Sequence, residues 1–462
     1  MPAGGRLLNQ TDAIGARLDR LPGGWPVWRL VVLISLGGFF EFYDLMMTGY
    51  ISPSLVAAGV FHQGAQGLFG LTDQATFAAA TFLGLFFGVL FFAQVADRFG
   101  RRAIFTASLI WYAAATAIMA LQSTALAIDA WRLIAGIGIG VELVTIDAYV
   151  SELVPPRLRG RAFAVNQAIQ FLAVPIVALA CWLLASRTVL GLAGWRWVML
   201  AGAVGALVVW VIRAAIPESP RWLAAHGRLD EAERIVARLE ARTGIAPCDP
   251  GGAPADPQAP PGRLREIFAP PYGRRTALMV AFNILQAIGF YGFGNWAPSL
   301  IAAQGHGVIR SLQYASIIAI AFPLSPLICA AFADRFERKA QIAAAAAGTA
   351  IFGLVFAFQS AAGVLIALGV AITFCNNWLS LAYHAYQAEL FPTRIRARAV
   401  GFVYSWSRAS TVVSSFVIAA LLGAFGAGGV FAFIAAAMAL ASASILMLGP
   451  RTSGRGLEEL SG

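Results

Sequence analysis

Ionisable side chains lie inside long apolar stretches of this chain, where burying a charge is energetically unfavourable. Each of them is therefore a candidate functional residue. A helical rise of about 1.5 Å per residue places Asp44 and Arg132 at overlapping depths of an apolar layer. A carboxylate beside a guanidinium stays ionised, whereas one left alone in an apolar cavity takes up a proton. Asp44 and Arg132 could therefore load and release a proton, with Glu41 and Glu142 as rival proton carriers. The alternative is a static ion pair that only fixes helix packing.

A second candidate site centres on Arg408, which falls near the middle of another apolar stretch, one helical turn after Tyr404. Its guanidinium can hold a carboxylate through two parallel hydrogen bonds. An internal partner, such as Glu142 or a backbone carbonyl, is the alternative. An aromatic lining with few polar groups would suit a small planar or aliphatic acid. Other side chains that could bind the same molecule are Gln286, Tyr291, Asn295, Asn377 and His384.

The stretches that carry these residues predict an all-α membrane protein. The chain is 59% hydrophobic and 12% charged, whereas a soluble domain carries about twice that share of charge. Apolar runs of about 20 residues can each cross the bilayer, and helices satisfy the backbone groups that lipid leaves without partners. We expect twelve transmembrane helices, at residues 28–57, 74–96, 103–122, 126–152, 162–186, 195–216, 276–303, 311–333, 339–359, 362–390, 397–422 and 426–449.

Two loop motifs occur twice at one constant offset. Residues 149–161 are echoed by residues 386–398, and residues 97–102 are echoed by residues 334–339. A shared offset for two unrelated motifs indicates a duplication. Six spans in each copy predict two parallel six-helix repeats with a cavity between them.

Charge predicts the orientation and the remaining organisation. Most of the 33 Lys and Arg residues fall in the tails and in alternate loops, which places both termini in the cytoplasm. The net charge of +10 then reflects topology and contact with anionic lipid, and nucleic-acid binding is not expected. The expected parts are a tail at 1–27, a bundle at 28–216, a cytoplasmic helix and disordered linker at 217–275, a bundle at 276–449 and a tail at 450–462.

The sequence predicts that the protein is not an enzyme. It contains no nucleotide-binding loop, metal-ligand cluster or nucleophile constellation. None of the four cysteines has metal-ligand spacing, so free thiols are expected. No cofactor is expected besides the proton as coupling ion.

Several motifs resemble those of the major facilitator superfamily. Residues 97–102 resemble its loop motif, with Ala93 where glycine is usual. Residues 217–223 resemble the sugar-porter and organic-ion branches, and residues 136–143 and 392–397 resemble organic-acid and nicotinate-type carriers. The resemblance implies the major facilitator fold, alternating access and a proton-coupling role for Asp44 and Arg132. It also implies a carboxylate-binding role for an arginine in the position of Arg408.

The resemblance to sugar porters is incomplete. Asn166 and Gln167 match their pattern, which implies a substrate-binding role for Gln167. Gln286 is followed by Tyr291 where these carriers keep an asparagine, and Leu379 and His384 replace two tryptophans. The leading hypothesis is therefore proton symport of a small organic acid across a bacterial inner membrane, by a monomer. The alternatives are a sugar or polyol symporter, a drug-extruding antiporter, and a receptor on a carrier fold. A stretch at 162–186 without glycine argues against the antiporter.

The repeated loops also carry paired charges of opposite sign. Such pairs could latch one state of the carrier and release in the other, whereas positive-inside topology alone explains the arginines but not the acids. The expected gating residues are Asp97, Arg101, Glu152, Arg157, Arg161, Asp334, Arg338, Glu389, Arg394 and Arg398.

Overall fold

The computed structural model describes residues 13–62, 64, 71–185, 187–213, 216–245, 264–331 and 336–452. Within these ranges it leaves undescribed the side chains of 90–98, 101, 143–145, 147–148, 208–213, 264, 330, 393–394 and 397. Within the segment predicted as a cytoplasmic helix and linker, 217–275, residues 246–263 lie outside the described residues.

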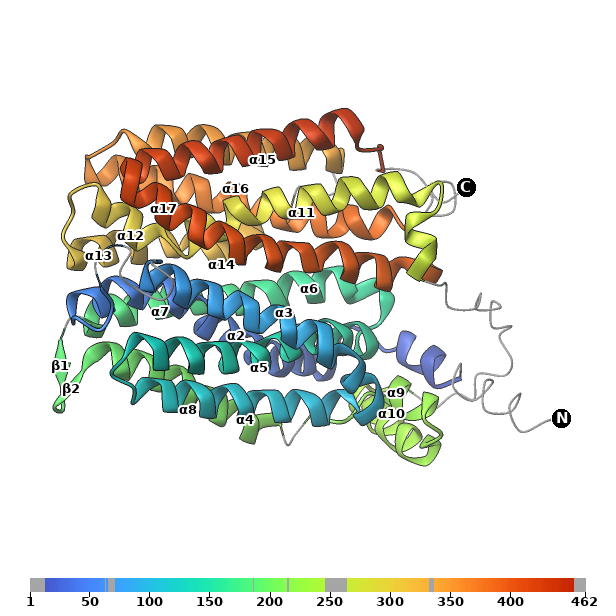
Figure 1. The fold of residues 1–462 in the computed structure, drawn as a ribbon. Coiled ribbons are helices and arrows are strands. Elements are labelled where there is room, and N and C mark those ends of the chain that lie inside the picture. The colour runs from blue at the N-terminus through green and yellow to red at the C-terminus, as the bar shows by residue number, and fades with distance from the viewer. Residues whose placement is uncertain are drawn as a thin grey trace.

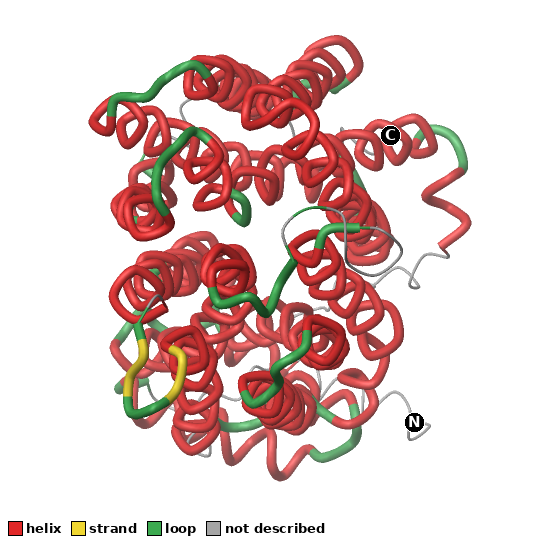
Figure 2. The backbone as a smooth tube through the Cα atoms, turned by 60° about the vertical axis from the view of Figure 1, so that its left-hand side comes forward, coloured by secondary structure: helices red, strands yellow, loops and turns green. Residues whose placement is uncertain are grey.

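Two groups of helices, one from each half of the sequence, lie side by side (Figures 1 and 2). The N-terminal half consists of α2 (Trp25–Ala57), α3 (Asp73–Phe99), α4 (Arg101–Ala120), α5 (Ala125–Leu153), α6 (Pro156–Phe171), α7 (Ala173–Ala180), the π-helix η2 (Cys181–Ala185) and α8 (Gly194–Arg213). Between η2 and α8, β1 (Thr188–Val189) and β2 (Leu192–Ala193) pair antiparallel in a short hairpin. Each predicted span of this half is therefore helical, with boundaries within a few residues except at the start of α6.

The C-terminal half consists of α11 (Tyr272–Gly294), α12 (Ala297–Ala303), α13 (Val308–Ala319), α14 (Ala321–Ala330), α15 (Arg338–Ala357), α16 (Ala362–Glu389) and α17 (Thr393–Leu448). The last two predicted spans both lie in α17, where Gly426 has a φ of 64° and a ψ of −163°. Only glycine adopts that conformation readily, so the chain reverses there without a longer loop. The predicted span 276–303 is broken near Asn295, since α11 ends at Gly294 and α12 begins at Ala297.

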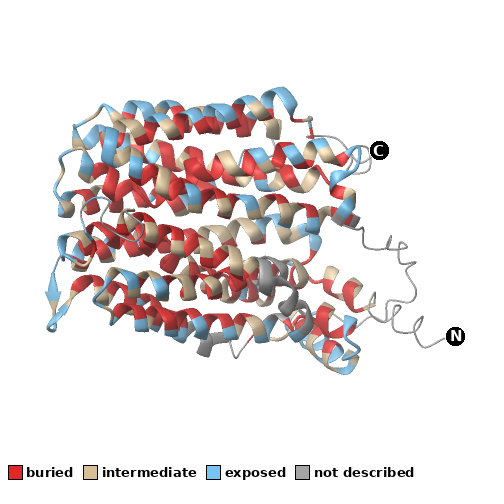
Figure 3. Cartoon of the chain, in the orientation of Figure 1, coloured by how far each residue is buried: buried red, intermediate tan, exposed pale blue. Residues whose placement is uncertain are grey.

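The composition of the helices fits a membrane. Eight helical segments of the described chain are long and apolar enough to span a bilayer, including the merged segment Arg398–Leu448. Large apolar side chains such as Trp111, Leu179 and Val413 are exposed on the outer faces, while the contacts between helices are buried (Figure 3). In water such exposure would be unfavourable, whereas lipid accepts it.

Two glycines of α5, Gly136 and Gly140, lie against glycines of α3. A Cβ on Gly84 would lie 2.8 Å from the Cα of Gly136, and one on Gly88 would lie 2.9 Å from the Cα of Gly140. The two backbones therefore touch, which fixes α3 against α5 and with it the residues that both helices present to the interior.

Helices α9 (Pro220–Ala225) and α10 (Leu229–Thr243) lie at one end of the bundle, opposite the β1–β2 hairpin (Figure 1). We refer to these as the α9–α10 end and the hairpin end. Ser219 caps α9 by accepting a 3.2 Å hydrogen bond from the Trp222 amide, as its place before a proline-led helix predicts. Glu218 accepts hydrogen bonds from the Arg102 amide at the start of α4. The contact between Glu218 and Arg102 ties the segment that leads into the predicted cytoplasmic helix to the N-terminal half.

The segment predicted as a tail at 1–27 is partly structured. Residues 13–19 are helical, and Ile14, Leu18 and Leu21 are buried against an apolar cluster that includes Val236 and Leu239 of α10. Arg17 donates two hydrogen bonds to Glu240, of 3.0 and 2.6 Å, and Arg221 pairs with Asp19 at 2.5 Å. The short apolar repeat in this segment could have indicated the packing, but its charges suggested a solvated tail.

We expect Arg17→Ala to loosen this docked segment. Glu240 is only 2% exposed, so losing its partner leaves a buried carboxylate unpaired, at a cost of about 1–3 kcal/mol. Hydrogen exchange of the purified protein should then show lower amide protection in residues 13–21 and in α10. Arg20→Ala, which changes an exposed arginine of the same segment, is the matched control. Equal protection in the two variants would contradict the prediction.

Candidate functional site

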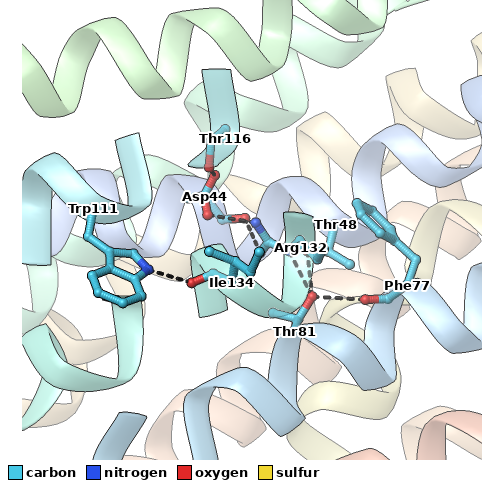
Figure 4. A network of polar contacts seen from close by, with 8 residues as sticks. All are labelled: Asp44, Thr48, Phe77, Thr81, Trp111, Thr116, Arg132 and Ile134. Carbon is cyan, nitrogen blue, oxygen red and sulfur yellow. Dashed lines mark hydrogen bonds and ion pairs between the residues drawn. The ribbon is translucent and has the colours of Figure 1, made fainter. Parts of the chain in front are cut away.

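Asp44 and Arg132 form a buried ion pair in the N-terminal half (Figure 4). Arg132 Nη1 donates to Asp44 Oδ2 at 2.6 Å, and Nη2 donates to the Asp44 backbone carbonyl at 2.8 Å. Their exposed fractions are 1% and 0%. The structure thus brings together α2 and α5 at the two residues whose depths were predicted to coincide.

Threonines complete the surroundings of this pair. Arg132 Nε donates to Thr81 Oγ1 of α3 at 2.8 Å, and Thr116 Oγ1 of α4 donates to Asp44 Oδ1 at 3.1 Å. Thr81 in turn donates to the Phe77 carbonyl at 3.0 Å (Figure 4). Four helices therefore hold the pair, and Arg132 keeps two hydrogen bonds that do not involve the Asp44 carboxylate.

The rival carboxylates are buried in the same half. Glu41 lies one helical turn before Asp44 on α2 with 2% exposure, and Glu142 is fully buried on α5. No recorded hydrogen bond between described residues joins either carboxylate to Arg132 or Arg408. Asp129 lies one turn before Arg132, toward the hairpin end, and is partly exposed.

Arg408 of α17 is held by tyrosines. Nη1 donates to the Tyr291 hydroxyl of α11, and Nη2 donates to the Tyr404 hydroxyl at 2.9 Å. The guanidinium carbon also lies 5.4 and 5.0 Å from the centres of these two rings. Arg408 is 2% exposed, its Nε has no hydrogen-bond partner, and no carboxylate of the described residues pairs with it. The observed hydrogen-bond partners are thus phenolic hydroxyls, which differ from the internal partners named as the alternative to a substrate, Glu142 or a backbone carbonyl.

More of the predicted substrate residues gather beside Arg408. Gln286 Nε2 lies 3.5 Å from the Tyr383 hydroxyl. The centre of the His384 ring lies 4.2 Å from that of the Tyr383 ring, with the two rings tilted, and 5.4 Å from that of the Tyr404 ring. His384 Nδ1 donates to the Ser380 carbonyl at 2.7 Å. Since a carbonyl can only accept, the proton of a neutral His384 lies on Nδ1 and Nε2 faces the Tyr383 hydroxyl.

The other predicted substrate residues lie elsewhere. Asn377 points its amide toward the Phe322 carbonyl of α14 at 3.5 Å. Asn295 occupies the break between α11 and α12, and Gln167 is half-buried on α6. No recorded contact between described residues joins these three side chains to Arg408.

Sequence reasoning missed the aromatic residues between the two halves. Phe82 of α3 packs edge-on against Tyr291 with ring centres 4.7 Å apart. Phe171 of α6 lies 6.5 Å from Phe290 and 5.8 Å from Phe322. The chain has 32 phenylalanines, so residue type alone could not single these out. They place the Arg408 cluster at the seam of the halves.

The halves also meet at the hairpin end. Gln74 Nε2 of α3 donates to Ser299 Oγ of α12 at 2.7 Å. Gly49 of α2 lies directly against the backbone of Asn295, where a Cβ would be 2.7 Å from the Asn295 Cα. The two halves are therefore closed against each other at this end.

The predicted gating residues are only partly described. Arg338 and Glu389 form an ion pair of 2.6 Å between α15 and α16, as expected of adjacent spans. Arg157 instead donates to the Leu21 carbonyl at 2.8 Å, and the Glu152 carbonyl accepts from Arg221 at 3.0 Å. Arg161 and Arg398 are exposed. The side chains of the remaining four lie outside the described residues: Asp97, Arg101, Asp334 and Arg394.

Two helical halves that face each other across an aromatic seam, with a buried ion pair in one and a buried guanidinium in the other, define a membrane carrier of the major facilitator type. A family model described as "Sugar (and other) transporter" matches residues 30–462. The chain belongs to this family and has its twelve-helix fold.

Relatives and solved structures agree with this assignment. The niacin transporter NiaP of Acinetobacter baylyi is 27% identical over 96% of this chain and 99% of its own. The arabinose-proton symporter of Bacillus subtilis is 26% identical over 93% and 94%. The structure of the E. coli xylose transporter XylE in a partially occluded inward-open conformation matches with a TM-score of 0.72 at 19% identity, covering 94% of this chain and 100% of that one. These relatives are transporters of small molecules and not enzymes.

Proposed function

We propose that this protein is a proton-coupled symporter of a small organic carboxylate. The observation that carries the proposal is Arg408, a buried guanidinium whose described partners are neutral hydroxyls. A buried cation without a counter-ion is unfavourable, and a carboxylate ligand would supply the missing charge with two charge-assisted hydrogen bonds. The resemblance to a niacin transporter supports this substrate class, because niacin is itself a carboxylic acid.

The proton would be carried by Asp44. A carboxylate that is paired with a guanidinium favours the ionised form, whereas one that is separated from it in apolar surroundings favours the protonated form. Movement of α2 against α5 during alternating access would make and break the pair. The resemblance to an arabinose-proton symporter supports the coupling ion. On this proposal the monomer lies in the bacterial inner membrane with the α9–α10 end and both termini in the cytoplasm, and the Arg338–Glu389 pair belongs to the cytoplasmic gate.

A sugar:proton symporter is the second candidate, favoured by the family description and by the same relative. A neutral sugar gives no reason for a buried guanidinium, whereas a carboxylate does. Binding to purified protein separates the two, with nicotinate and benzoate as acids and D-xylose and L-arabinose as sugars.

We expect Arg408→Ala to weaken nicotinate or benzoate binding by about 30-fold or more, because it removes the charged half of a buried pair. Arg408→Lys should restore little of this affinity, since an ammonium lacks the two parallel N–H donors with which a planar guanidinium binds both carboxylate oxygens. Equilibrium binding to detergent-purified protein checks this, with Arg310→Ala, an exposed arginine at the hairpin end, as control. Binding of sugars but of neither acid by the wild-type protein would reject the carboxylate proposal and favour the second candidate.

A further inference from the structure

Tyr291 touches three parts of the carrier at once. Its hydroxyl accepts a hydrogen bond from Arg408 Nη1, and its ring packs on Phe82 of the other half at 4.7 Å. Its backbone carbonyl accepts from the Asn295 amide at 3.0 Å, at the helix break that closes against Gly49. Tyr404, whose hydroxyl accepts the other hydrogen bond from Arg408, lies one turn before Arg408 on α17. Tyr291 is therefore the partner of Arg408 that also reaches across the seam to Phe82.

We propose that the Tyr291 hydroxyl is an internal stand-in for the substrate carboxylate and sets the specificity of the site. This inference rests on the proposed function. The hydroxyl accepts from Nη1, one of the two terminal nitrogens to which an end-on carboxylate binds, so a substrate that binds both terminal nitrogens end-on displaces it. A phenol oxygen is neutral and accepts from one nitrogen, whereas a carboxylate spans both and neutralises the charge.

The same geometry narrows the substrate class. A neutral amide or alcohol brings no charge with which to displace the phenol, so the site discriminates an acid from its amide. Arg132 and Arg408 are the buried cationic side chains in the described part of the chain, and Arg132 already pairs with Asp44. Of these two described guanidinium groups, that of Arg408 alone is then available to substrate, which fits a substrate with a single carboxylate group. The rings of Tyr291, Tyr404 and His384 beside it favour a planar acid.

Displacement of the hydroxyl also couples substrate binding to the closure of the two halves against each other. When its hydroxyl leaves Arg408, the Tyr291 ring is free to move. This ring lies on Phe82 across the seam, and Tyr291 precedes the break at Asn295 by one helical turn. A neutral molecule that left the hydroxyl in place would not release this contact. Tyr291 is therefore a specificity and positioning residue that acts through Arg408.

The test is Tyr291→Phe, with nicotinate and nicotinamide as matched probes. Without the hydroxyl, Arg408 Nη1 has no acceptor in the empty site, so nicotinate should bind about 3- to 10-fold more tightly. Nicotinamide should gain more, so that the preference for acid over amide narrows. Tyr43→Phe, which removes a buried hydroxyl that donates to the Val198 carbonyl at 3.1 Å in the N-terminal half, should leave both affinities within about 2-fold.

The outcomes are distinct. Tighter nicotinate binding with a narrowed preference supports the inference. Weaker nicotinate binding would make the hydroxyl a direct substrate contact, and unchanged binding would make it irrelevant; either result overturns the inference while carboxylate transport stands. Failure of wild-type protein to bind nicotinate and benzoate rejects the proposed function itself. Should Tyr291→Phe unfold, Tyr291→Leu also lacks the hydroxyl and must change the preference in the same direction.

Discussion

Replacing Gly49 with tryptophan is expected to hold the carrier open at the hairpin end and to reduce transport by about 100-fold or more, because closed packing has no space for a side chain. A Cβ at this position already lies 2.7 Å from the Cα of Asn295 and still closer to its carbonyl. The backbone of Asn295 cannot move out of the way of a new side chain as a flexible side chain could. Even Gly49→Ala should therefore slow transport.

Binding distinguishes a blocked transition from a damaged fold. If Gly49→Trp only prevents closure, the purified variant should still bind the probe that the wild type binds, while exchange across proteoliposomes is lost. Gly363→Trp is the control, since Gly363 lies at the start of α16 toward the same end and a Cβ there would have nothing within 4 Å. Near-normal exchange by Gly49→Trp would show that the Gly49–Asn295 contact is not part of the transport cycle.

The fold was largely predictable because few structures satisfy backbone groups in lipid. The length of each apolar run predicted one membrane span, and the duplicated loop motifs predicted two similar halves. The break after α11 was visible in the glycines before Asn295 and in Pro298, which begins a helix readily but cannot continue one. The docked segment at 13–21 was not predicted, since three buried apolar residues among charges are too weak a pattern.

Side-chain partners were harder to predict than depth. Depth along a helix follows from counting residues, which was enough to match Asp44 with Arg132. The partners of Arg408 depend on how α11 and α17 rotate about their axes, and nearly uniform apolarity leaves that rotation undetermined in the sequence. Tyr291 and Tyr404 therefore replaced the expected partners. The seam aromatics were hidden for the same reason, because lipid-facing and seam-facing phenylalanines look alike in the sequence.

Asp44→Asn is expected to abolish accumulation driven by a proton gradient, by about 100-fold or more, while exchange of substrate in the absence of a gradient persists. Asparagine keeps the shape of the side chain but carries no titratable proton. Arg132 would keep its hydrogen bonds to the Asp44-position backbone carbonyl and to Thr81, of 2.8 Å each. These remaining bonds give the buried guanidinium partners and favour a folded variant.

A static ion pair makes a different prediction. There, losing the carboxylate would leave Arg132 buried without its counter-ion and destabilise the protein by about 3–5 kcal/mol, so accumulation and exchange would fall together with the unfolding temperature. Asp129→Asn, one turn away and partly exposed, should preserve accumulation. Glu41→Gln and Glu142→Gln test the rival carriers. If either of them stops accumulation while Asp44→Asn does not, the proton travels on that carboxylate and the Asp44–Arg132 pair serves packing alone.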